Sequence, residues 1–226
     1  MKEHKMKILL NIKGMMFAVL AMFALTSASN AAGLGGVYVE VASSAIGAVV
    51  EGDHNSRTGQ IATGAVGKTA ITGSYGIGYM TPRTNKLGID GGYMVTPGQA
   101  KITHTSTSRT KDSVSLDISD ATQWYLAPMI NITEDASLYV KFGFDSTDLT
   151  TVGDVNKISS MDGDTVAVGT VMSWGSNIYL RTEAGRTTYD KLKFTGLGTA
   201  DGVSTSDSIT VTPEINYGRV AIGYKF

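Results

Sequence analysis

Apolar and polar residues alternate with a period of two in eight stretches of the chain. The clearest stretch, residues 138–145, sets one apolar parity against one polar or small parity: Leu138, Val140, Phe142 and Phe144 against Tyr139, Lys141, Gly143 and Asp145. Successive side chains of a β-strand point to opposite faces, so each stretch predicts a strand with one apolar face and one polar face. An apolar aromatic face opposite a buried Lys and Asp does not suit a soluble core.

The eight predicted strands lie at residues 36–50, 66–80, 87–95, 114–132, 138–145, 165–174, 178–185 and 208–226. The connections after the second, fourth and sixth strands are short. The other connections are long and polar, at residues 51–63, 97–112, 146–163 and 189–207, and are predicted to be surface loops. Part of residues 97–112 could extend the strands above the membrane. Outer-membrane barrels have short periplasmic turns and long extracellular loops. The pattern therefore predicts an all-β protein, an eight-stranded antiparallel up-and-down transmembrane β-barrel.

Two residues of the fourth strand interrupt its regularity. Pro128 has no amide donor, so we expect a bulge or a weakened ladder there. Asp120 has the same parity as the lipid-facing residues Leu116, Ile118 and Trp124. A charge facing lipid in mid-membrane is costly, so Asp120 should lie above the hydrocarbon.

The inward parity carries a nearly balanced set of charges. We predict that nine charged side chains lie in the barrel interior: Glu40, Lys68, Asp90, Lys141, Asp145, Arg181, Glu183, Arg219 and Lys225. The lumen of an eight-stranded barrel is only wide enough to be filled by side chains, and buried charges must pair. We therefore expect a polar plug, in which small residues such as Gly76, Gly78, Ala167 and Gly169 make room for long neighbours. The alternative is a narrow ion path lined by the same residues.

The outward parity supplies the aromatic residues expected at the membrane interfaces: Tyr79, Trp124, Trp174, Tyr224 and Phe226. The last strand, with Val220, Ile222 and Tyr224 on its apolar face, ends on Phe226. It resembles the C-terminal strand of bacterial outer-membrane barrels, where the terminal Phe is part of the assembly signal. This resemblance implies the lipid bilayer and the barrel-assembly machinery as partners.

In strand number, loop asymmetry and final strand, the chain resembles the small eight-stranded outer-membrane barrels that include the opacity proteins and the attachment-invasion proteins. The resemblance implies a monomeric, non-enzymatic barrel that acts in surface interaction, adhesion or envelope integrity. Its extracellular loops would contact a ligand that the sequence does not identify.

The N-terminal residues have the features of a secretory signal peptide. Lys2, Lys5, Lys7 and Lys13 precede an apolar run at residues 15–25, and small residues follow. The run is about eleven residues long, too short for a transmembrane helix. We predict a cleaved signal peptide at residues 1–31 and a barrel domain at residues 32–226, located in the outer membrane of a Gram-negative bacterium.

Composition excludes several classes of function. The net charge of −1 falls to about −4 without the signal peptide, so a nucleic-acid partner is not expected. The chain has no Cys, which rules out disulfides, thiolate metal sites and a Cys nucleophile. With 27 Gly and 4 Pro beside abundant Thr, Ser, Val and Tyr, the composition suits many strands. No cofactor and no metal site are predicted.

One triplet suggests an enzyme. His104-Thr105-Ser106 resembles the His and Ser dyad of the lipid A deacylase barrels, but it lies in a Ser/Thr-rich stretch without an identifiable third carboxylate. We therefore predict no catalytic residues, and His54 is read as a solvated loop residue. Three alternatives to a surface barrel stay open: a small porin-like channel, a lipid A-modifying enzyme, and a soluble lipocalin-like barrel with apolar residues inside.

Overall fold

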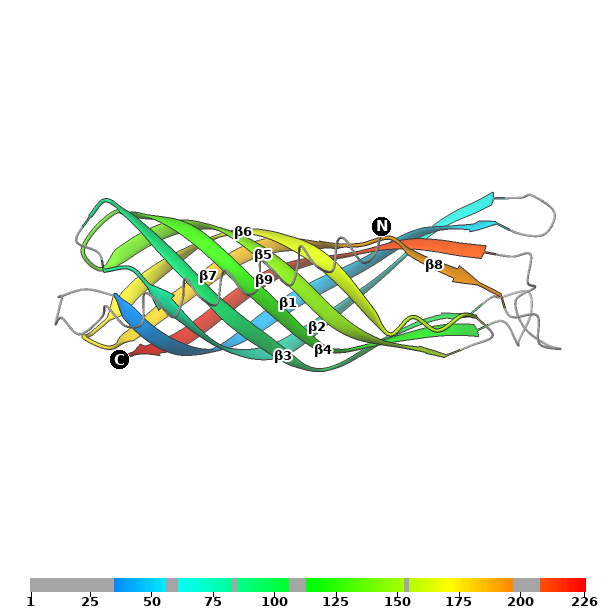
Figure 1. Ribbon diagram of the computed structural model, residues 1–226, viewed down its shortest axis with the longest axis horizontal. Coiled ribbons are helices and arrows are strands. Elements are labelled where there is room, and N and C mark those ends of the chain that lie inside the picture. Colours follow the sequence, from blue (N-terminus) through cyan, green and yellow to red (C-terminus); the bar gives the residue numbers. More distant parts are fainter. Residues whose placement is uncertain (1–34, 56–60, 83–84, 106–112, 153–154, 197–207) are drawn as a thin grey trace, which may run out of the picture.

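The computed structural model describes residues 35–55, 61–82, 85–105, 113–152, 155–196 and 208–226. These residues form one antiparallel sheet (Figure 1). Its strands are β1 (Gly36–Asn55), β2 (Ile61–Met80), β3 (Leu87–Thr105), β4 (Ser113–Asn131), β5 (Ala136–Val152), β6 (Ser160–Trp174), β7 (Ile178–Tyr189), β8 (Leu192–Thr195) and β9 (Ser208–Lys225). No helix in this part of the chain is long and apolar enough to cross a membrane.

The sheet closes on itself through its first and last strands. Neighbouring strands pair in chain order from β1 to β7, β9 follows β7, and β9 pairs with β1 from Tyr38↔Lys225 to Asn55↔Ser208. The short strand β8 adds to the outer part of β9, where Leu192 is opposite Val211. Eight strands thus form a closed up-and-down barrel, which confirms the predicted fold class.

The two faces of the wall differ in polarity, as β5 illustrates. Val140 and Phe142 on its outer face are 39% and 51% exposed, whereas Tyr139 and Lys141 on its inner face are 3% and 0% exposed. Apolar side chains also cover the outside of other strands, among them Ile77, Leu126, Val168 and Ile222. This arrangement, apolar outside and polar inside, is that of a membrane-spanning barrel and the inverse of a lipocalin-like one.

The strands continue beyond the predicted spans, so the predicted loops at residues 51–63 and 146–163 are wrong in part, whereas an extension of the strands was expected within residues 97–112. β1 and β2 pair as far as Asn55↔Ile61, within the polar segment 51–63. β3 likewise runs to Thr105, and β5 runs to Val152. Polar and Gly-rich composition is typical of loops, but backbone pairing in water needs no apolar face. These extensions form the outer end of the barrel, on the right in Figure 1.

The interior of this extension is apolar, unlike the charged interior of the rest of the barrel, and its apolar side chains form a second core. Its buried members are Leu149, Val155, Met161, Tyr189, Leu192 and Phe194. Ile118, Ile209 and Ile215 pack against it. Burial, together with the Asp145 carboxylate, raises the pKa of the Tyr189 hydroxyl above its ordinary value. β8 is held to the barrel by this core.

Ile118 faces this core because β4 bulges, contrary to the prediction that it faces lipid. The register of β4 with β5 shifts between Ser119 and Thr122, and Asp120 has a φ of 47°. One extra residue at a bulge reverses the parity of the residues beyond it. Asp120 itself is exposed. The register with β5 is the same on both sides of Pro128, so the bulge lies at Asp120 and not at Pro128. The β4–β5 ladder has no pairs at Ala127 and Pro128, which is the weakened ladder expected there.

β2 and β3 separate in the outer half of the barrel. Their pairing extends only from Met80↔Asp90 to Tyr75↔Val95. In Figure 1 the outer part of the β1–β2 hairpin runs beside β9, while the β3–β4 hairpin leaves in another direction. The wall is therefore continuous at the end that carries the short turns and divided between β2 and β3 further out.

Candidate functional site

The structure places the predicted interior charges at three levels of burial. Seven are buried: Glu40, Asp90, Lys141, Arg181, Glu183, Arg219 and Lys225. Asp145 is half-buried, and its carboxylate contacts the same network. Lys68 differs from the prediction, because it is exposed on the outer part of β2. Alternation assigned Lys68 correctly to the inward parity, but β2 and β3 are no longer paired at its height, so the side chain is exposed.

Arg181 of β7 lies at the centre of the interior. Its guanidinium contacts two carboxylates, with Nη2 2.7 Å from Asp90 Oδ2 and Nε 3.3 Å from Glu40 Oε2. Four tyrosine rings surround it, with centres 5.3 to 6.0 Å from the guanidinium carbon: Tyr38, Tyr125, Tyr139 and Tyr179. Ring faces attract a cation, so carboxylates and rings together stabilise a charge that has no access to water.

Arg219 of β9 connects this centre to a second group of charges. It forms a buried ion pair with Glu40, which also accepts a hydrogen bond of 2.9 Å from the Tyr179 hydroxyl. On its other side, Arg219 Nη1 lies 3.9 Å from Glu183 Oε1. Each of the two arginines is therefore flanked by two carboxylates.

Lys141 of β5 completes the network. It forms a buried ion pair with Glu183, which accepts hydrogen bonds of 2.7 Å from both Tyr139 and Tyr217. Lys141 also donates to Gln123 Oε1 at 2.9 Å, and Gln123 Nε2 donates to Asp145 Oδ1 at 3.0 Å. In the connected core, Glu40, Asp90 and Glu183 balance Lys141, Arg181 and Arg219. Side chains from opposite sides of the barrel thus meet across the lumen.

Five tyrosines fit against glycines directly opposite them on the neighbouring strand. The pairs are Tyr38↔Gly78, Tyr125↔Gly92, Tyr139↔Gly169, Tyr179↔Gly223 and Tyr217↔Gly185. A Cβ added at any of these glycines would overlap the tyrosine side chain. Gly78 and Gly169 were expected to accommodate long neighbours. The sequence analysis did not name these tyrosines as site residues. The sequence feature that could have identified them is a Tyr and a Gly of inward parity at matching heights on adjacent strands.

The predicted aromatic residues lie in several environments. Trp174 and Phe226 are 72% and 71% exposed, and Phe226 makes an edge contact with Tyr224 at 5.3 Å between ring centres. Trp124 is half-buried against Tyr93, with ring centres 4.6 Å apart. Tyr79 differs from the exposed aromatic residue that was predicted, because it is only 7% exposed.

Of the two candidate enzyme residues, only His104 belongs to the described part of the chain. His104 lies in β3 opposite Val114, and Ser106 lies outside the described residues, as does the predicted signal peptide, residues 1–31. No group of three or more His, Asp or Glu residues that could hold a metal ion is found among the described residues.

A closed barrel with an apolar outside and an ionic inside defines a transmembrane β-barrel of the outer-membrane class. The chain belongs to the outer membrane protein beta-barrel domain family, whose model matches residues 16–224. The predicted membership of the small outer-membrane barrels is thereby confirmed. The apolar belt places these strands in a lipid bilayer. A comparison with curated protein sequences finds no match.

Solved structures of outer-membrane proteins resemble this barrel at low sequence identity. OprG of Pseudomonas aeruginosa has a TM-score of 0.54 and 13% identity, with 85% of this chain and 96% of that chain covered. Ail of Yersinia pestis has a TM-score of 0.43 and 14% identity, covering 82% of this chain and 99% of that chain. The neisserial surface protein NspA has a TM-score of 0.41 and 13% identity, covering 84% of this chain and 97% of that chain. The likeness to OprG supports the fold.

Proposed function

We propose that this protein is a non-enzymatic barrel in the outer membrane of a Gram-negative bacterium, acting at the cell surface in adhesion or envelope integrity. The observation that supports this proposal is the ion-pair and tyrosine network around Arg181, which fills the interior with paired side chains from β1, β3, β5, β7 and β9. A barrel filled in this way acts through its outer end. Residues 1–31 serve as the cleaved signal peptide. The strand ending at Phe226 addresses the protein to the barrel-assembly machinery, and the product is a monomer.

The outer end suits a surface role because it is a folded platform. β1 and β2 remain paired to Asn55↔Ile61, and the second core around Phe194 joins β8 to the barrel. A rigid platform loses little conformational entropy when it contacts a partner, so it can present adjacent loops at a low entropic cost. This proposal assigns extracellular contact to the extension and the loops it carries.

Trimming the extension tests this role without disturbing the ion-pair network. Replacing residues 51–65 by an Asn-Gly turn would join Val50 to Val66, which already lie opposite each other, by a two-residue hairpin. Cells producing this variant in place of the natural protein should lose surface attachment or detergent resistance to the level of cells lacking it. The folded, heat-modifiable band on a gel should be retained.

The control is Ser176→Ala, in the exposed turn between β6 and β7 at the opposite end of the barrel. Cells carrying it should behave as cells with the natural protein do. The role assigned to the extension would be contradicted if the trimmed protein, at equal surface level, supported attachment and detergent resistance fully.

The rival function is a channel for ions or small solutes. It requires a continuous path through the interior, where the two arginines now lie between paired carboxylates. A lipid A-modifying enzyme is the other rival function. If the protein were such an enzyme, His104→Ala or Ser106→Ala would abolish its activity on lipid A. Our proposal predicts instead that the natural protein and both variants all lack activity on lipid A.

A further inference from the structure

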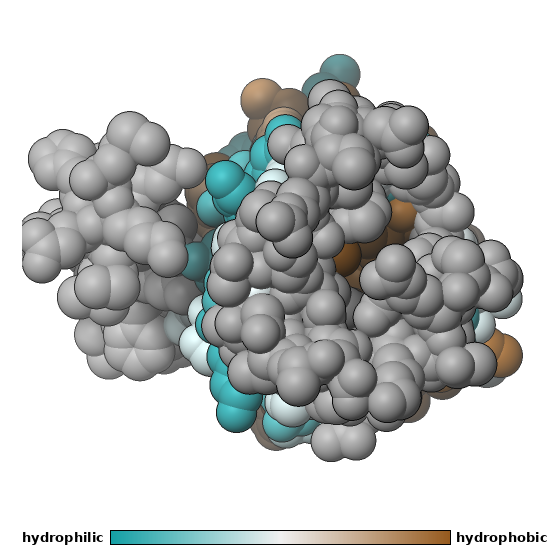
Figure 2. Space-filling view, turned by 90° about the vertical axis from the view of Figure 1, so that its right-hand side faces the viewer, coloured by the Kyte–Doolittle hydropathy of each residue, from teal (hydrophilic) through white to brown (hydrophobic). Residues whose placement is uncertain are grey.

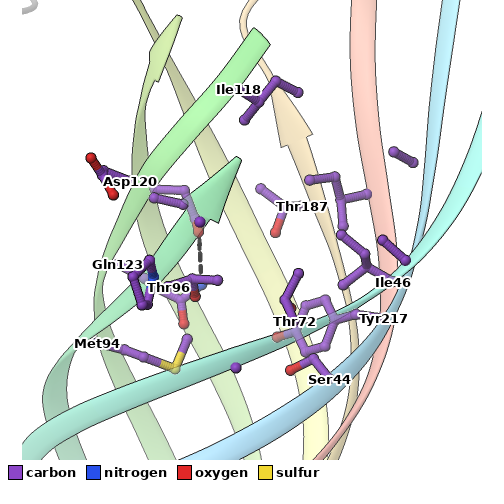
Figure 3. Close-up of a pocket in the computed structure, with 18 of the residues that line it drawn as sticks. Ser44, Ile46, Thr72, Met94, Thr96, Ile118, Asp120, Gln123, Thr187 and Tyr217 are labelled. Atoms are coloured by element: carbon purple, nitrogen blue, oxygen red, sulfur yellow. Dashed lines mark hydrogen bonds between the residues drawn. The ribbon is translucent and has the colours of Figure 1, made fainter. Parts of the chain in front are cut away.

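A cavity of about 320 Å³ lies on the outer side of the ion-pair network. Side chains from several strands converge on it (Figure 3). Ile46, Thr72 and Tyr217 lie on one side, Met94 and Gln123 lie on the other, and Ile118 stands above. The volume is at the lower end of the range of about 300–1,000 Å³ found for small-molecule sites. It suits one ring with a short chain better than a lipid with two acyl chains.

The wall of this cavity is mainly apolar. Ile46, Ala70, Met94, Ile118 and Ile215 contribute aliphatic or thioether surface, and Tyr217 adds an aromatic ring. The bulge at Asp120 gives the cavity this character, because it turns Ile118 inward. The cavity can therefore hold an apolar body that would otherwise be in water or lipid.

The floor carries the carboxylate of Asp145, which forms no ion pair among the described residues. It accepts hydrogen bonds from Gln123 and from Thr165, both neutral. Lys141 also attracts this carboxylate, but its ammonium group is paired with Glu183. Arg219 also lines the cavity, but it is already paired with Glu40 and lies near Glu183. Lys68 is exposed at the rim, where water and salt screen its charge. The floor therefore favours a cation.

Two features give access to the cavity. The pairing of β2 and β3 ends at Tyr75↔Val95, and Thr72 and Thr96, beyond the last pair, both line the cavity. Viewed from the outer end, the molecule has a hollow with hydrophobic residues inside it (Figure 2). A small molecule can thus reach the apolar wall without crossing the ion-pair network below it.

We propose that this cavity binds a small organic cation with an apolar body, with its charged nitrogen at Asp145 and its body against Ile46, Met94 and Ile118. Binding leaves the ion-pair network closed, so the ligand is held on the outer side. This binding activity is separate from the proposed surface role, which requires no ligand in the cavity.

Three matched compounds test the proposal on the full-length protein in detergent micelles. They are 4-phenylbutylammonium, 4-phenylbutanol and 4-phenylbutyrate, which share a body and differ in the charge of the head. Isothermal titration calorimetry, corrected for partitioning into empty micelles, should show saturable binding of the cation. The alcohol should bind at least about tenfold more weakly, since a charged hydrogen bond is lost. The carboxylate should show no saturable binding.

Two variants locate the site, and one serves as the control. Asp145→Asn should weaken binding of the cation about tenfold or more while leaving the alcohol nearly unchanged. Ala70→Trp should abolish binding of both, because the indole fills the cavity. Asp148→Asn is the control, because it removes an exposed carboxylate on the same strand as Asp145 that does not line the cavity, and it should change binding less than about twofold. Heat-modifiable gel mobility checks that each variant is folded.

The proposal is overturned by either of two results. One is tighter binding of the carboxylate than of the ammonium, which would make Arg219 the anchor. The other is binding of the cation by folded Asp145→Asn and Ala70→Trp proteins at the affinity of the natural protein, which would place it in the micelle or elsewhere on the barrel.

Discussion

At the scale of single residues, the interior depends on tyrosine side chains that pack against glycines, which have no side chain. Each tyrosine around Arg181 occupies the space that a Cβ on the opposite strand would need. The ring can then lie flat on the wall while its hydroxyl reaches a carboxylate, as Tyr179 reaches Glu40 at 2.9 Å. Glycine is thus required here for close packing, although it is otherwise unfavourable in strands.

Gly223→Ala should destabilise the barrel, because its Cβ would overlap the Tyr179 ring. Overpacking of this kind costs about 1–3 kcal/mol. Urea titration of protein folded into lipid vesicles, followed by gel mobility, measures the change in the free energy of unfolding. Gly218→Ala on the same strand is the control, since no atom lies within 4 Å of its added Cβ, and it should change stability by less than about 0.5 kcal/mol. Equal effects of the two variants would refute the role of the glycine.

Glu183→Gln should be among the most destabilising single changes in the interior. It leaves Lys141 buried without its carboxylate, and breaking one side of a buried pair costs about 3–5 kcal/mol. Adding Lys141→Met should recover part of that loss, because the unpaired charge is then gone. The control is Glu214→Gln, whose partner Arg186 is 59% exposed, and a loss of less than about 1 kcal/mol is expected. The interpretation would be contradicted if the double variant had a lower free energy of unfolding than Glu183→Gln alone.

At the scale of elements, alternation predicted the strands where lipid imposes it and failed where water replaces lipid. Residues 138–145 were assigned correctly, since lipid on the outside and buried charges on the inside demand a strict period of two. The outer segments were predicted to be loops because no apolar face marked them. Ile118 was predicted to face lipid because nothing in the alternation reveals the φ of 47° at Asp120 that reverses the parity.

Phe194→Ala should detach β8 without opening the barrel. Phe194 is the largest side chain that β8 buries in the second core, and removing its ring leaves β8 held by Leu192, by four residues of pairing to β9 and by the hydrogen bonds of Thr195 with Asn156. Trypsin should then cleave the folded protein after Lys191 or Lys193 several-fold faster, while the heat-modifiable band stays unchanged. Thr195→Ala, on the exposed face of the same strand, should leave the cleavage rate as it is. If Phe194→Ala is as resistant as the natural protein, the second core does not hold β8.

At the scale of the whole molecule, the barrel has three zones in series. A lipid-facing cylinder is filled by the Arg181 network, an apolar cavity lies on its outer side, and a folded extension surrounds the entrance. The charged interior and the closed fold could be predicted, because parity alone sets them. The tyrosine and glycine pairs, the separation of β2 from β3 and the cavity on the outer side of the network could not, because they depend on register between strands.

Single-channel recording of the full-length protein in planar lipid bilayers tests the central claim, that paired side chains close the lumen. The natural protein should give no reproducible current steps. A variant combining Arg181→Ala with Tyr38→Ala, which removes the central guanidinium and one of its rings, should give steps once the network is open. Reproducible steps from the natural protein, altered in size by Lys141→Ala or Arg219→Ala, would instead show that these residues line a conducting path.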